Sequence, residues 1–116
     1  MAKLNVLFHI NEEDRFEVLL LNITNSLKDA GKEKGDIAVL TNGPSVKAYT
    51  DIEMIREMKE LSGKGVQFLA CRNAINEMCS EWACIEEDNC QHLTIVPVGI
   101  TEVIRKQRDG YAYVKP

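Results

Sequence analysis

The chain has 116 residues, of which 45% are hydrophobic and 28% are charged, and its net charge is −4. This length fits one domain, residues 1–116, with a core that needs no disulfide or metal. The negative charge argues against a nucleic-acid partner, and no apolar run approaches the ~18 residues that span a membrane. The N-terminal stretch lacks the features of a signal peptide, so we expect a cytoplasmic protein with reduced thiols.

The first third of the chain predicts a strand followed by a helix. Residues 4–10 are almost continuously apolar, which is typical of a parallel strand buried on both faces. Asn11 is the expected N-cap of a helix, and apolar residues recur at spacings of three and four between Phe16 and Ala30. Gly31 is placed to end this helix.

The middle of the chain predicts two further strand–helix pairs, separated by turn residues. The expected elements are a strand at 37–40, a break at 41–44, a helical turn at 46–49, a helix from about 51 to 62, a strand at 66–70 and a helix at 73–79.

The last third begins with an irregular, acidic segment, residues 80–91. A strand is expected at 93–98, and Pro97 within it suggests an edge position or a strand end. A short helix at 100–108 and a final alternating strand at 111–114 complete the pattern. The apolar residues of the final strand suggest an interface between copies at a sheet edge.

Strands that alternate with helices predict an α/β fold: a single domain with a mainly parallel five-stranded sheet and helices on both faces. Such sheets bind ligands at the carboxyl ends of their strands, and three polar segments follow strands here. The residues that we expect on this one rim are His9, Asn42, Gly43, Cys71, Arg72 and Asn73.

Cys71 is the strongest candidate for chemistry. It lies between an apolar strand and a helix, where backbone N–H groups and the helix dipole favour an anion, and Arg72 adds positive charge. The functional interpretation is a nucleophilic or sulfur-carrying thiolate. The structural alternative is a small buried hydrophobe at a strand end, which is common for a free cysteine.

The other rim residues also have two interpretations. Asn42 offers an amide and Gly43 lets a ligand approach the backbone, but the same residues form an ordinary turn. His9 is a general base or a partner of Cys71 in one interpretation, and a hydrogen-bonded structural residue in the other. No phosphate-binding loop and no hydrolase triad occurs in the sequence.

Three more cysteines, Cys79, Cys84 and Cys90, precede His92. Their spacing differs from the close pairs of zinc folds, so we expect no metal and no cofactor, although a metal site remains one alternative. A second alternative makes one of them a resolving thiol for Cys71, and a third makes them incidental.

Taken together, five segments resemble the DsrE/DsrF-like family of small α/β sulfur-relay proteins, in its branch of short stand-alone domains. They span nearly the whole chain and are residues 6–11 (VLFHIN), 41–46 (TNGPSV), 65–73 (GVQFLACRN), 96–100 (VPVGI) and 107–116 (QRDGYAYVKP). The segment between residues 76 and 92 departs from the family pattern, because it carries the three extra cysteines and an acidic stretch.

The resemblance implies a parallel sheet between helices, a homo-oligomer (a trimer or hexamer) and a persulfide-holding cysteine after the third strand. Cys71 matches that cysteine, and His9, Asn42, Gly43 and Asn73 match positions on the same rim. The first hypothesis is therefore a sulfur carrier with sulfurtransferase-like activity, whose partners are a sulfur-donor and a sulfur-acceptor protein. The alternative is a non-catalytic oligomeric scaffold or small-ligand-binding module.

Overall fold

A computed structural model describes residues 3–78 and 93–116 of the chain. The elements, in chain order, are β1 (Leu4–Ile10), η1 (Glu13–Arg15), α1 (Phe16–Ala30), η2 (Gly31–Glu33), β2 (Lys34–Thr41), η3 (Gly43–Thr50), α2 (Ile52–Gly63), β3 (Val66–Cys71), α3 (Arg72–Met78), β4 (Leu93–Val96), α4 (Gly99–Arg108) and β5 (Ala112–Val114).

The five strands form one parallel sheet in the order β4-β3-β2-β1-β5. The predicted α/β fold is therefore confirmed, and β4 lies at an edge as Pro97 suggested. Along the chain, β2, β3 and β4 are added one after another on one side of β1. The connection from β4 to β5 then crosses the sheet, so that β5 pairs with the other side of β1. Because parallel crossovers are right-handed, this reversal of direction puts the last helix on the opposite face from the first two.

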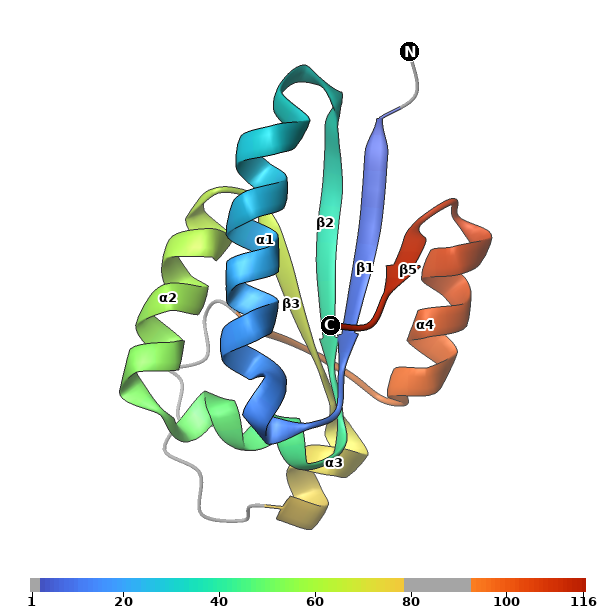
Figure 1. Ribbon diagram of the computed structural model, residues 1–116. Helices are drawn as coiled ribbons and strands as arrows, with labels where there is room; N and C mark the ends of the chain where they lie inside the picture. The colour runs from blue at the N-terminus through green and yellow to red at the C-terminus, as the bar shows by residue number, and fades with distance from the viewer. Residues whose placement is uncertain (1–2, 79–92) are drawn as a thin grey trace.

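Helices cover both faces of the sheet. Figure 1 shows α1 and α2 side by side, with α4 apart from them. One core cluster joins alternate strand residues such as Phe8, Val39 and Phe68 to α1 and α2, and it contains most of the buried side chains. A second cluster joins Leu7, Ala38, Leu40 and Leu69 to Val96 and to Val103 of α4.

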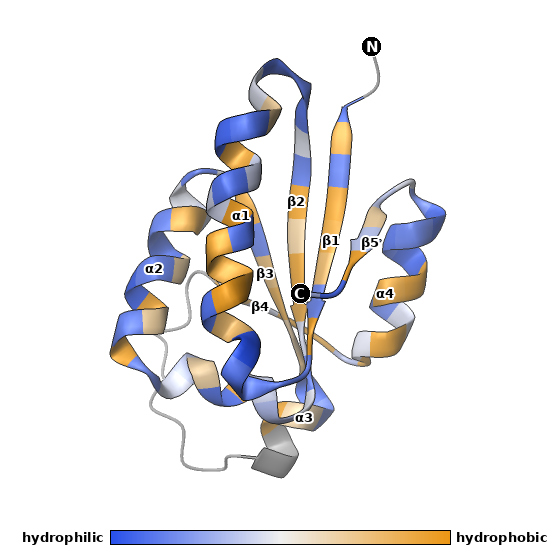
Figure 2. Ribbon diagram, in the orientation of Figure 1, coloured by the Kyte–Doolittle hydropathy of each residue, from blue (hydrophilic) through white to orange (hydrophobic). Residues whose placement is uncertain are grey.

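The hydropathy pattern explains this division. Figure 2 shows largely apolar central strands, whereas the helices carry an apolar stripe and an opposite polar side. Strands that alternate between the two clusters must be apolar at almost every position, as residues 7–10 are. Among the described residues, no helix has the length and apolar character needed to cross a bilayer.

The prediction for Asn11 was wrong. Asn11 does not cap a helix, because the chain first makes the short 3-10 helix η1 after Glu12, and α1 begins only at Phe16. The side chain of Ile52 is exposed at the first turn of α2. Its neighbour Asp51 is the N-cap and accepts hydrogen bonds from two backbone N–H groups of that turn.

Candidate functional site

Cys71 is the last residue of β3, and α3 begins at the next residue. It pairs in register with Val96 of the edge strand β4. Its side chain is a free thiol and is only 8% exposed. The strand-to-helix junction expected from the sequence is thus present, at the carboxyl-end rim of the sheet.

The helix packed on the Cys71 sulfur is α4, which the sequence did not point to. A Cβ atom built on Gly99, the first residue of α4, would lie 3.6 Å from Cys71 Sγ and 3.3 Å from Cys71 Cβ. The N-cap of α4, Val98, makes no side-chain capping hydrogen bond. The first N–H groups of an α-helix lack partners within the helix, so this end of α4 favours an anion beside it.

Asn42 directly follows β2, at the same rim of the sheet as Cys71. Thr41, the last residue of β2, pairs with Ala70, the residue before Cys71. The Asn42 backbone N–H donates to the carbonyl of Ile10 at 3.1 Å, which ties this residue to the end of β1.

A tight turn fixes the backbone of Asn42. Gly43 has a φ of 59°, a left-handed conformation that glycine adopts without steric cost. Ser45 is fully buried, and its hydroxyl lies 2.7 Å from the carbonyl of Asn42 and 2.9 Å from that of Ile10. The segment is therefore a hydrogen-bonded turn, as the structural interpretation held, and this turn also aims Asn42 at the rim.

His9 is buried near the end of β1 and contacts two polar side chains. Its Nε2 lies 3.1 Å from Asn42 Oδ1, and its Nδ1 lies 2.6 Å from the hydroxyl oxygen of Tyr113 in β5. The two rings meet edge to face, with centroids 5.6 Å apart. His9 and Asn42 are thus brought together as expected on the rim.

Tyr113 is the residue that the sequence analysis missed as part of this site. Its strand was expected, but only as a sheet edge available for oligomerisation. The signal would have been the pairing of β5 with β1, which puts Tyr113 opposite Leu7 and two positions from His9. That pairing joins the two ends of the chain and leaves no local pattern in the sequence.

Arg72 and Asn73 begin α3 directly after Cys71, and both side chains are exposed. Within the described part of the chain, neither makes a hydrogen bond or ion pair with a residue of this site. The structure therefore brings His9 and Asn42 into contact, places Gly43 and Cys71 at the same rim, and leaves Arg72 and Asn73 on the surface.

The remaining cysteine predictions lie outside the described residues, since Cys79, Cys84, Cys90 and His92 fall in the segment 79–92. Within residues 3–78 and 93–116, no group of three or more His, Cys, Asp or Glu residues could hold a metal ion.

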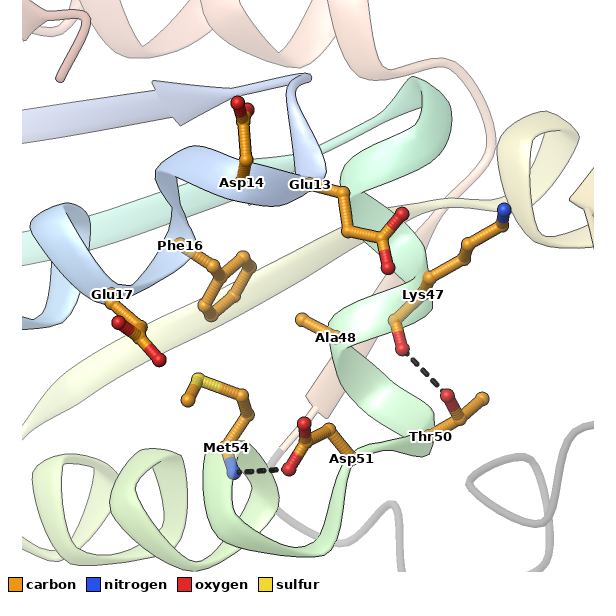
Figure 3. A pocket seen from close by; sticks show the side chains of 9 residues that line it. All are labelled: Glu13, Asp14, Phe16, Glu17, Lys47, Ala48, Thr50, Asp51 and Met54. Carbon is orange, nitrogen blue, oxygen red and sulfur yellow. Dashed lines mark hydrogen bonds between the residues drawn. The ribbon is translucent and has the colours of Figure 1, made fainter.

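An open cavity of about 820 Å³ lies at the same end of the sheet, and Cys71 is not among its lining residues (Figure 3). It is framed by η1, α1, η3 and α2, and Phe16 and Met54 contribute apolar surface. Its charged side chains are Glu13, Asp14, Glu17, Asp51 and Lys47. Four carboxylates against one ammonium group disfavour a thiolate or persulfide anion, so we do not assign sulfur chemistry to this cavity.

Comparison with known proteins identifies a family and several similar solved structures. The model of the DsrE/DsrF-like family matches residues 34–116. A protein of unknown function from Methanobacterium thermoautotrophicum is 29% identical with a TM-score of 0.79, over 98% of this chain and 100% of that one. A second, from Bacteroides thetaiotaomicron, is 21% identical with a TM-score of 0.74, over 97% and 94% of the two chains, and shows the shared fold. No curated protein matches the chain.

Proposed function

This chain belongs to the DsrE/DsrF-like family, and we propose that it carries sulfane sulfur as a persulfide on Cys71. The observation that supports this most strongly is the position of the thiol. Cys71 ends a central parallel strand on the rim where α/β sheets bind ligands, with the N-terminal end of α4 packed on its sulfur.

The proposed reaction has two steps that need no oxidant. The Cys71 thiolate attacks the outer sulfur of a donor persulfide, a new Sγ–S bond forms, the S–S bond of the donor breaks, and the donor leaves as a thiolate. An acceptor thiolate then attacks the outer sulfur on Cys71. The Cys71 Sγ–S bond breaks, and Cys71 returns to the thiolate. Donor and acceptor are expected to be proteins, which makes the activity sulfurtransferase-like.

The surroundings of Cys71 suit an anion that must be held and then released. The N–H groups at the start of α4 are neutral donors, which stabilise a thiolate or persulfide without a permanent ion pair. Arg72 and Asn73 are exposed beside the thiol, where they can meet a docked donor or acceptor.

A persulfide also extends the reach of a buried cysteine. Cys71 is only 8% exposed, which protects the sulfur from solvent. The added sulfur lies about 2.0 Å beyond Sγ, so it gives a partner thiolate a target that the thiol alone does not offer.

Trypsin makes the decisive measurement simple. Lys64 and Arg72 are the flanking cleavage sites, so residues 65–72 form a peptide that contains Cys71 and none of the other three cysteines. The reduced protein is incubated with a persulfide donor and digested, and the masses of the peptides are measured. The mass of one sulfur atom added to this peptide, and lost again with an acceptor thiol, would support the proposal.

The matched control is Cys71→Ala, in which residues 65–72 must show no added sulfur. A well-folded wild-type protein with no added sulfur on this peptide would overturn the proposal. That result would favour the non-catalytic alternative, in which Cys71 only packs the end of β3.

A further inference from the structure

A row of polar side chains crosses the rim in the same order as the strands that bear them. Tyr113 comes from β5, His9 from β1, Asn42 from the end of β2 and Cys71 from β3, and the strand order in the sheet is β3-β2-β1-β5. Hydrogen bonds of 2.6 Å and 3.1 Å join the first three. The row therefore leads from an edge strand to the candidate sulfur site.

Each hydrogen bond in this row sets the direction of the next. The Oδ1 atom of Asn42 can only accept, so the Nε2 atom of His9 carries the proton and donates to it. In the neutral ring, Nδ1 is then an acceptor, and the hydroxyl of Tyr113 donates to it. The two bonds together hold one tautomer of His9.

The same bonds orient the amide of Asn42. Asn42 lies between β1 and β3, and its oxygen is held on the β1 side by His9. Its NH2 group is therefore left for the β3 side, and extending the Thr41–Ala70 pairing by one residue leads to Cys71. We infer that Tyr113 and His9 are positioning residues that hold the Asn42 NH2 group toward the Cys71 sulfur. The sulfur chemistry that this serves rests on the proposed function.

The opposite arrangement shows why Tyr113 matters. Without its hydroxyl, no donor faces Nδ1, and His9 can adopt the tautomer that carries its proton there. Nε2 would then accept from the Asn42 NH2 group, and the amide oxygen would turn toward Cys71. An acceptor beside a thiolate or persulfide raises the free energy of the anion, whereas a donor lowers it.

The hydroxyl of Tyr113 does not depend on His9 for a hydrogen-bond partner. Its side chain is 41% exposed, so water can satisfy the hydroxyl. His9, in contrast, is 8% exposed and needs partners for both ring nitrogens.

The test compares Tyr113→Phe with Tyr111→Phe, which removes a hydroxyl two residues away that bonds Asp36 rather than His9. Iodoacetamide alkylation of Cys71 at neutral pH is followed on the peptide of residues 65–72, and the nitrogen NMR shifts of His9 report its tautomer. We expect Tyr113→Phe to slow alkylation roughly tenfold and to change the His9 spectrum, and Tyr111→Phe to do neither.

Position 9 provides a second pair of variants. The amide of His9→Gln can still donate to Asn42 and accept from Tyr113, so alkylation should stay within about twofold of wild type. His9→Leu offers neither bond and should slow alkylation as Tyr113→Phe does. Equal alkylation in Tyr113→Phe and Tyr111→Phe would overturn the inference, as would slow alkylation with an unchanged His9 spectrum.

Alkylation needs no persulfide, so the two proposals fail separately. If the wild-type protein takes up no sulfur but Tyr113→Phe still slows alkylation, only the proposed function is lost. If the wild type and Tyr113→Phe take up sulfur and react with iodoacetamide equally well, only the positioning role is lost.

Discussion

Gly99 brings the first turn of α4 against Cys71. A side chain at this position would come within 3.3 Å of Cys71 Cβ and also within 3.3 Å of the buried Leu40 Cδ2. Both contacts are tighter than ordinary packing, so the absence of a Cβ permits this approach of helix to strand.

We therefore expect Gly99→Ala to lower the free energy of unfolding by about 1–3 kcal/mol, because neither neighbour can move freely in a packed core. The matched control is Gly63→Ala at the end of α2, where an added Cβ would meet nothing within 4 Å. That variant should raise the free energy of unfolding by about 0.4–1 kcal/mol. Urea unfolding measures the free energy of unfolding of both variants. Equal changes in Gly99→Ala and Gly63→Ala would show that α4 is not closely packed on Cys71.

Ser45→Ala should loosen the turn that aims Asn42. The hydroxyl of Ser45 is buried between the carbonyls of Ile10 and Asn42, at the ends of β1 and β2. Its loss leaves these carbonyls without that donor, and we expect the free energy of unfolding to fall by about 1–3 kcal/mol. Ser62→Ala is the control, since the described residues give the Ser62 hydroxyl no hydrogen bond. A neutral Ser45→Ala would contradict this account of the turn.

The edge strand β5 is proposed as an interface between copies of the chain. Val114 is 37% exposed and lines a cavity of about 390 Å³, whose other lining residues include the apolar Leu4 and Val6 and the polar Asn22 and Lys34. Light scattering should show an oligomer, and Val114→Lys should shift it toward the monomer, because a charge on an edge strand opposes pairing. Ile52→Lys, at an exposed position of α2, should leave the oligomer intact. A monomeric wild type would refute the proposed interface.

We expect the protein to lose stability at alkaline pH because the hydroxyl of Tyr111 ionises. Burial, and then the nearby carboxylate of Asp36, raises the pKa of Tyr111 above its ordinary value of 10.0. As the pH rises, Tyr111 therefore loses its proton at a lower pH in the unfolded chain than in the folded chain. Its contribution to the free energy of unfolding is fully present below pH 10.0 and falls as the pH rises through the pKa of the folded state.

Urea unfolding at about pH 9 and about pH 11 tests this against Tyr111→Phe, which cannot ionise. The wild type should lose more of its free energy of unfolding between the two pH values than the variant does. An equal loss in both proteins would mean that Tyr111 ionises alike in the folded and unfolded chains.

Much of the fold could be predicted from local pattern. The apolar run of residues 4–10, the turn at Gly43 and the glycine that ends α1 all act on their immediate neighbours, and the corresponding elements formed where expected. Two strand boundaries differ from the prediction: the second strand begins at Lys34 rather than at residue 37, and the fourth ends at Val96 rather than at residue 98. Asn11 failed as a cap because the 3-10 helix η1 intervenes, and no propensity of a single residue reveals this.

By itself, the sequence determined that strands and helices alternate, that the sheet is parallel, and that His9, Asn42 and Cys71 follow or end strands. These features depend on hydrophobic periodicity and turn chemistry within a few residues. Only the tertiary structure decided that β5 pairs with β1 and that α4 crosses to the opposite face. The pairing of β5 with β1 brings Tyr113 into contact with His9, and the position of α4 brings Gly99 close to Cys71. Both depend on packing between segments far apart in the chain.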